Sequence, residues 1–228
     1  HSATMVKAGV YLLARLNPVL GNTSEWQTII PLVGGLTMLI GAFLALTQKD
    51  LKAILAYTTI SALGTLMLLL GIDTELSVKA ALIFLIVHAL YKGTLFMVAG
   101  SIDKHTGTRD IDMLGSLAYK MPITTIVALL ALLSMAGLPP MLGFIGKEII
   151  YDAKIQAPHI ADYVTFFGVV SNIFMVWVSI FIAYRVFFRR SYKGHKSPGE
   201  SSVHFWVGPG VLVIISLVLG LFPYQLGE

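Results

Sequence analysis

The sequence predicts an all-α, polytopic membrane protein with about seven transmembrane helices, one of them discontinuous. Hydrophobic residues make up 56% of its 228 residues and charged residues only 12%, against typical values of about 45–50% and about 25%. The mean hydropathy is +0.81. Because so few polar side chains cannot cover a globular surface, we expect lipid to contact much of the chain.

Apolar stretches recur along the chain at the length that a spanning helix requires, about 20 residues. Turn residues separate them, and the first stretch is expected to end at Asn17-Pro18. The expected spans lie at about 2–16, 26–47, 51–71, 77–101, 122–155, 160–187 and 203–222.

The stretch at 122–155 is too long for one untilted span and contains Gly137, Pro139 and Pro140. The two prolines remove helix N–H donors and clash with the preceding turn. Broken backbone at membrane depth survives only next to protein or water, and transporters use such discontinuous helices at ion sites. We expect a discontinuous span here. A kink, or a loop between a short helix and an interfacial one, is the alternative.

Three lysines, Lys7, Lys92 and Lys147, lie inside the expected spans, and His88 precedes Lys92 by one helical turn. A charge at the bilayer centre costs at least about 2.5–3.5 kcal/mol, so such residues are functional candidates. Burial disfavours an ammonium and histidine titrates near neutral pH, so both types suit a proton relay. The alternatives are that the lysines extend to an interface and that His88 bonds a backbone carbonyl.

A group of polar side chains lies on the expected span 51–71. Hydroxyls in membrane helices usually bond the preceding turn or a neighbouring helix, and a water path between sites is the less favoured interpretation. The group comprises Tyr57, Thr58, Thr59, Ser61 and Thr65.

Enzyme signatures are missing from the sequence. It contains no phosphate loop, dinucleotide fingerprint or HExxH motif, and it has no cysteine for a thiolate site. The acids are scattered and metal-ligand spacing is absent, so a metal site is unknown. No basic patch is interleaved with aromatics, so nucleic acid is not an expected partner. We expect neither catalytic residues nor an organic cofactor.

The remaining lysines and arginines, which lie in loops or near the ends of the spans, favour one side of the membrane. One side collects ten: Lys49, Lys52, Lys104, Arg109, Lys120, Arg185, Arg189, Arg190, Lys193 and Lys196. The other side has Arg15, Lys79 and Lys154. By the positive-inside rule the basic loops are cytoplasmic and the C-terminal end lies outside. Because His1 opens directly into an apolar pattern without a basic leader, we expect a piece of a longer protein.

Four segments carry a family resemblance: HSATMVKAGVYLLAR (1–15), DLKAILAYTTISALG (50–64), HALYKGTLFMVAGSIDKHTGTRDI (88–111) and AGLPPMLGFIGKE (136–148). Together they resemble the proton-translocating antiporter family. That family includes the antiporter-like membrane subunits of respiratory complex I and the large subunits of Mrp-type multisubunit sodium/proton antiporters. Lys7, the HALYKGTLFMVAG stretch and the GTRDI loop are most similar to the A-type subunits of the Mrp antiporters.

The resemblance implies an architecture with two five-helix repeats of inverted topology. Residues 1–24 would be the last helix of the first repeat and a loop. Residues 25–190 would form the second repeat, and residues 191–228 a loop and a closing transmembrane helix. The Glu–Lys pair and central lysine of the first repeat would lie upstream of this chain.

The resemblance also implies roles for the four basic residues of the spans. Lys7 would link two half-channels, His88 and Lys92 would form the central proton relay, and Lys147 would be the terminal lysine. One position departs from the pattern, because Phe84 stands where complex I relatives often have a further histidine.

We therefore expect a membrane subunit, or a fragment of one, that exchanges protons for Na⁺ or another monovalent cation across a plasma membrane. It would work with other membrane subunits in a hetero-oligomer, as a secondary transporter and not as an enzyme. One alternative is a proton-pumping membrane subunit of NADH:quinone oxidoreductase; another is a structural membrane scaffold. Sodium requires oxygen ligands and no carboxylate is evident in the membrane interior, so the sequence does not locate the cation site.

Overall fold

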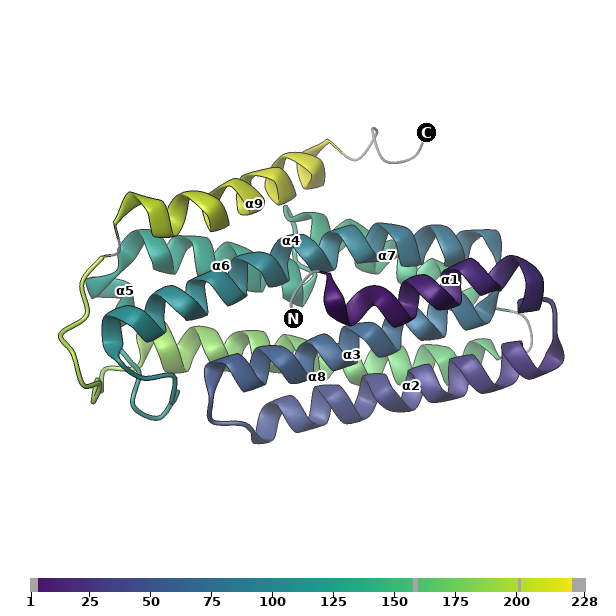
Figure 1. The fold of residues 1–228 in the computed structure, drawn as a ribbon, viewed down its shortest axis with the longest axis horizontal. Helices are drawn as coiled ribbons and strands as arrows, with labels where there is room; N and C mark the ends of the chain where they lie inside the picture. Colours follow the sequence, from purple (N-terminus) through teal and green to yellow (C-terminus); the bar gives the residue numbers. More distant parts are fainter. Residues whose placement is uncertain (1–3, 158–159, 201, 223–228) are drawn as a thin grey trace.

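The computed structural model describes residues 4–157, 160–200 and 202–222 as a bundle of helices that share one long axis (Figure 1). The elements are η1 (Met5–Lys7), α1 (Ala8–Leu20), α2 (Ser24–Thr47), α3 (Leu51–Ile72), α4 (Glu75–Thr106), α5 (Leu117–Lys120), α6 (Pro122–Ala136), α7 (Leu142–Ile155), α8 (Ala161–Ile182), the π-helix η2 (Ala183–Phe188) that continues α8, and α9 (Val203–Leu221). No strand occurs in these ranges, and the predicted all-helical class is confirmed.

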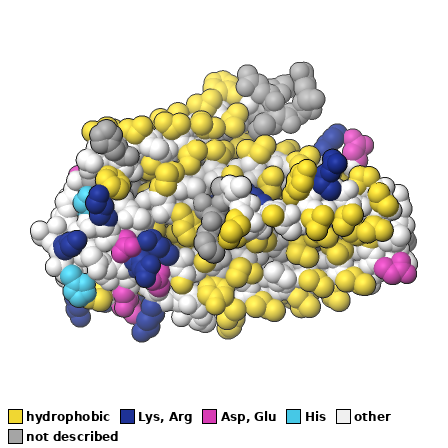
Figure 2. All heavy atoms as spheres, in the orientation of Figure 1, with side chains coloured by type: hydrophobic (Ala, Val, Ile, Leu, Met, Phe, Trp, Pro, Cys, Tyr) yellow, Lys and Arg dark blue, Asp and Glu magenta, His cyan; other side chains and the backbone are white. Residues whose placement is uncertain are grey.

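Four of the described helical segments are long and apolar enough to cross a membrane: α2, α3, α4, and α8 together with η2. α6 and most of α9 are shorter apolar helices. On the face shown in Figure 2, hydrophobic side chains extend along the bundle, while charged side chains lie toward its two ends, with the larger group and the histidines at the left-hand end. Multi-pass membrane proteins show this distribution, because their apolar length contacts lipid and their ends contact water.

The first helix ends later than the sequence predicts. An end at Asn17-Pro18 is wrong, because α1 continues through Pro18 to Leu20. The amide of Asn17 donates a hydrogen bond to the Asp73 carboxylate (2.6 Å), which follows the last residue of α3. This contact holds the last turn of α1 in place, and the chain turns only after Leu20.

Helix α4 is the centre of the bundle and packs against α3, α6, α7 and α9. It has 32 residues and begins with a capping box between Thr74 and Ser77. α7 lies along its first half, where Gly146 faces Val87, and α6 lies along its second half (Figure 1). α6 and α7 therefore follow each other along α4 as one discontinuous span, as the predicted fold class requires.

Glycines allow α2 and α3 to pack at close range. A Cβ atom on Gly34 would lie 2.6 Å from the backbone nitrogen of Leu68, and a Cβ atom on Gly64 would lie 2.6 Å from the backbone oxygen of Gly34. Small residues commonly bring membrane helices together, because lipid provides no hydrophobic drive for their association. α3 is thereby fixed between α2 and α4, where it supplies partners to the buried lysine of α4.

Asp50 caps the start of α3. Its Oδ1 accepts hydrogen bonds from the backbone N–H groups of Lys52 (2.8 Å) and Ala53 (3.1 Å). We expect Asp50→Ala to lower the free energy of unfolding by about 1 kcal/mol, the usual loss for an N-cap. Thermal unfolding in detergent measures the loss. Lys49→Ala, which removes only an exposed ion pair, is the control, and equal losses in both variants would contradict the capping role.

Candidate functional site

Lys92 is fully buried near the middle of α4. Its Nζ donates a hydrogen bond to the carbonyl oxygen of Leu55 (3.1 Å) and another to the hydroxyl of Thr58, both in α3. It also lies 3.8 Å from the sulfur of Met135 at the end of α6. All three partners are neutral, and no ion pair among the described residues includes this lysine. Because an unpaired buried ammonium is costly, these surroundings favour a lysine that can release its proton.

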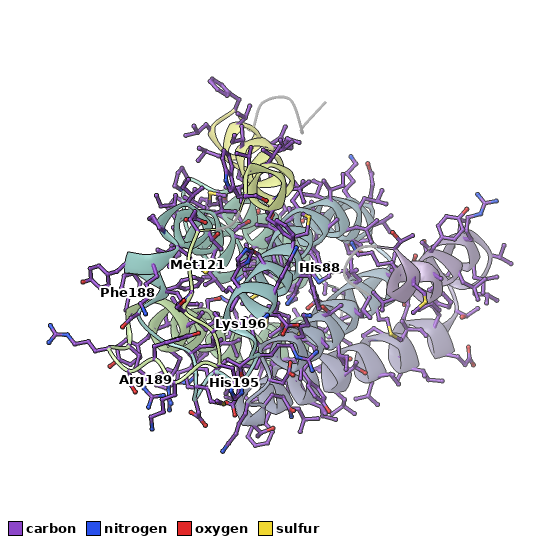
Figure 3. All side chains as sticks on the ribbon, turned by 60° about the vertical axis from the view of Figure 1, so that its left-hand side comes forward. His88, Met121, Phe188, Arg189, His195 and Lys196 are labelled. Carbon is purple, nitrogen blue, oxygen red and sulfur yellow. The ribbon has the colours of Figure 1, made fainter. Side chains whose placement is uncertain are left out.

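His88 is fully buried one turn before Lys92. Its ring lies between those of Phe84 and Tyr91, with centroid distances of 6.1 and 5.3 Å. Neither Nδ1 nor Nε2 has a hydrogen-bond partner within the described part of the chain, so the expected alternative, a bond to a backbone carbonyl, is not found there. Figure 3 shows His88 among the helices, whereas His195 and Lys196 lie in the connection before α9. Buried polar groups are normally paired, so an imidazole in these surroundings calls for an explanation, such as a role in proton transfer or a bound water.

Lys7 connects the start of α1 to α4. Its side chain is 7% exposed, and its Nζ donates a hydrogen bond to the carbonyl oxygen of Leu85 (3.0 Å). Leu85 precedes His88 by three residues and Lys92 by seven, spacings that return to one side of a helix. The structure thus brings Lys7 to the segment of α4 that carries the other two residues.

The break between α6 and α7 is built from backbone geometry. Gly137 has a φ of 75°, in the left-handed region that favours glycine. The N–H of Leu138 donates to the carbonyl oxygen of Leu133 (3.0 Å), as in a Schellman helix end. Pro139 and Pro140 then follow without an N–H to donate, so the helix ends there.

Lys147 in α7 lies across this break. Its Nζ donates hydrogen bonds to the carbonyl oxygen of Ala136 (2.7 Å), the last residue of α6, and to the amide oxygen of Asn172 in α8. The unpaired carbonyls at a helix C-terminus carry partial negative charge and favour a cation. A side chain on Gly137 would interfere, because a Cβ atom there would lie 2.9 Å from the Cε of Lys147. The break therefore places neutral oxygen acceptors around the ammonium group of Lys147.

A cavity of about 50 Å³ lies beside these lysines and is called here the lysine cavity. A water molecule needs about 10–15 Å³ of such space, so the cavity accommodates a few. Lys147 lines it, as do Tyr91 and Met135, which neighbour and contact Lys92. Its other polar lining residues are Ser61, Thr65, Tyr151, Lys154, Ser171 and Asn172. The cavity therefore reaches from residues next to Lys92 to Lys147.

The hydroxyls of α3 mostly bond the preceding turn, as the favoured interpretation predicts. Thr59 donates to the carbonyl oxygen of Leu55 (2.9 Å), and Thr65 donates to that of Ser61 (3.2 Å). Thr58 has a second role, because its hydroxyl also accepts from Lys92.

Two polar residues of the lysine cavity are missed by the sequence prediction. Lys154, which the sequence analysis counts only among the cations of the less basic side, is instead 3% exposed within α7, so its burial was not predicted. The physical reason is that Gly168 of α8 has no side chain and leaves room for the lysine. Asn172 lies in an apolar helix and accepts from Lys147. The signals that could have found them were the seven-residue spacing from Lys147 to Lys154 and the polar interruption at Ser171-Asn172.

Residues 2–175 match the family described as NADH:quinone oxidoreductase/Mrp antiporter, transmembrane. The chain therefore belongs to this family of membrane proteins. It is 39% identical, over 248 aligned residues, to the A-type subunit of the Na⁺/H⁺ antiporter of Alkalihalophilus pseudofirmus, covering 98% of this chain and 31% of that protein. It is 41% identical over 230 residues to the A/B-type subunit of a probable K⁺/H⁺ antiporter of Rhizobium meliloti, covering 99% and 23%.

Among solved structures, the chain is similar to one chain of the Mrp complex from Dietzia sp.. The TM-score is 0.89 at 36% sequence identity, and the match covers 99% of this chain and 25% of that chain. The chain thus spans less than a third of the length of these relatives.

Proposed function

We propose that the chain is the proton-carrying part of a membrane subunit of a monovalent cation/proton antiporter. The observation that carries the proposal is Lys92, a lysine without exposed surface whose ammonium contacts only neutral groups. A stabilising role is a poor explanation, because removing a charge from water costs more than neutral partners return. A group that alternates between amine and ammonium explains why a lysine occupies this position.

The proposed proton path has four proton-binding residues, in the order Lys7, His88, Lys92 and Lys147. Lys7 is bound to the same segment of α4 that presents His88 and Lys92. The end of α6 lies between Lys92 and Lys147. Met135 contacts Lys92, and the carbonyl oxygen of the next residue, Ala136, accepts a hydrogen bond from Lys147. A proton on one of these residues disfavours a proton on the next, because the two positive charges repel each other. A proton that arrives at one residue therefore promotes release of the proton from the next residue along the path.

The exchanged ion is proposed to be Na⁺. The two curated relatives are named as subunits of Na⁺/H⁺ and probable K⁺/H⁺ antiporters, which supports a monovalent cation in general. Within the described residues, no group of three or more His, Cys, Asp or Glu side chains is placed to hold a metal ion. We assign the cation path to other membrane subunits or to segments outside this chain.

The proposed setting is a plasma membrane, with this chain inside a hetero-oligomer of membrane subunits. An assembly of several proteins is supported by similarity to a chain of the Dietzia Mrp complex. The basic loops are proposed to face the cytoplasm, and the bias becomes ten cations against two, Arg15 and Lys79, once Lys154 is placed inside the bundle. Residues 1–24, 25–190 and 191–228 are proposed as the end of a first repeat, a second five-helix repeat and a closing helix.

Transport in vesicles tests the proposed function. Membrane vesicles that contain the complete complex are loaded with a pH-sensitive dye, and Na⁺ is added without NADH or quinone. We expect Na⁺ to collapse an imposed pH gradient, because an antiporter needs only the two ion gradients. K⁺ is added in a parallel sample to define the cation.

The family that the chain matches also includes NADH:quinone oxidoreductase, which makes a subunit of a redox-driven pump the second candidate. The buried lysines would then carry protons driven by electron transfer in other chains. The same vesicles distinguish the two. Proton movement that requires NADH and quinone, with no response to Na⁺ or K⁺ alone, would contradict the antiporter and support the pump.

A further inference from the structure

We propose that Lys154 is a further proton-carrying residue, which receives the proton from Lys147 and releases it at the end of the bundle where α7 ends. This inference rests on the proposed function and adds one residue to the proposed proton path. It starts from two lysines that line one cavity although no carboxylate lines it.

The spacing of the two lysines places both on one face of α7. Seven residues are close to two helical turns and correspond to about 10 Å along the axis. Lys147 lies in the second turn of α7 after the break, and Lys154 is the residue before the last of the helix. The lysine cavity runs along the face between them, lined by α3 and α8 on the opposite side.

The surroundings of Lys154 do not explain it as a structural residue. Its side chain is 3% exposed, and its Nζ makes no hydrogen bond to an acceptor of the described chain. The ammonium lies 5.6 Å from the ring centroid of Tyr151 and next to Gly168, where a Cβ atom would overlap it. An unpaired buried lysine lowers stability, so its presence indicates a different use.

The groups that face Lys154 across the cavity favour proton exchange. The titratable ones are Lys147 and Tyr151 from α7 and Tyr91 from α4, and the others are hydroxyl and amide groups of α3 and α8. In the proposed step the Lys147 ammonium gives a proton to cavity water, and the water gives one to the neutral amine of Lys154. Lys147 becomes the amine and Lys154 the ammonium, so protons and charge balance. Mutual repulsion of two ammonium groups then favours release from Lys154.

Substitutions in the complete complex test this step, with exchange measured in vesicles and normalised to the assembled amount. Lys154→Met should reduce exchange by about 100-fold, the usual contribution of a positioned proton-transfer group. Lys154→Arg should be equally inactive, because a guanidinium keeps its proton. Lys154→His should retain part of the activity with an optimum at lower pH, because an imidazole binds its proton more weakly than an amine.

The control is Lys79→Met, which removes an exposed lysine near the same end and should leave exchange unchanged. If the unmodified complex exchanges ions and Lys154→Met does so at the same rate, the proposal for Lys154 is overturned while the proposed function stands. Full activity of Lys154→Arg would also overturn it, because a fixed charge would then suffice. If Lys154→Met does not assemble, the proposal is tested by comparing the other two variants. Exchange by Lys154→His but not by Lys154→Arg supports it, and equal exchange by both overturns it. Absence of exchange in the unmodified complex is a different result, which contradicts the proposed function itself.

Discussion

Lys92→Ala should reduce cation-driven proton exchange by at least about 100-fold, the scale on which a positioned proton-transfer group acts. The substitution removes the protonatable group at the midpoint of the path, and neither Thr58 nor Met135 can replace it. Assembly should persist, because two effects on stability oppose each other. The substitution loses packing contacts, but it also removes the cost of burying a charged or polar amine among neutral groups. Dye-reported collapse of the pH gradient measures the rate, and the amount of assembled complex is measured in the same membranes.

Lys79→Ala is the matched control for this prediction. It removes a lysine from the same helix, but one that is 66% exposed and paired with Glu75 one turn earlier (2.8 Å). Exchange should remain at the level of the unmodified protein. Normal exchange in an assembled Lys92→Ala variant would contradict the relay, whatever the control shows.

Gly143→Ala should disrupt the discontinuous span. In the first turn of α7, a Cβ atom on Gly143 would overlap the carbonyl oxygen of Ser134 and lie 2.6 Å from its carbon. Overpacking of this kind usually costs about 1–3 kcal/mol. It would also move α7 away from the end of α6, where Lys147 finds its carbonyl partner. We expect lower thermal stability in detergent and loss of most of the exchange activity.

Gly100→Ala is the corresponding control, because a Cβ atom on Gly100 of α4 would have no neighbouring atom within 4 Å. Alanine favours helix over glycine by about 1 kcal/mol, so stability should stay constant or rise slightly. If Gly143→Ala were as stable and active as this control, the close contact at the break would not be a requirement of the fold.

Much of the fold follows from apolar length and turn chemistry. The expected span 51–71 corresponds to α3, and the expected break is a left-handed glycine followed by two prolines. The ends of the helices were harder to predict from the sequence. α1 passes through Pro18, because a contact between Asn17 and Asp73, which are distant in sequence, holds its last turn.

The candidate site was predicted where a single residue type stands out, and missed where the environment comes from another helix. Lys92 is conspicuous as a cation in the middle of a long apolar stretch. Lys154 is not, since its position near the end of a span resembles that of a loop lysine. Its burial depends on Gly168 of α8, which leaves room for the lysine side chain. The role of Asn172 likewise depends on the approach of α8 to Lys147.

The depth of α4 in the bilayer tests the central claim most directly, namely that Lys92 lies in the hydrocarbon core. The chain has no cysteine, so a spin label can be placed at Ile86 or at Met97, outward-facing residues that flank Lys92 on α4. Both labels should collide readily with dissolved oxygen and rarely with a water-soluble nickel chelate. A label at either position that meets the nickel chelate as often as a headgroup label does would contradict the placement of Lys92, and with it the proton path.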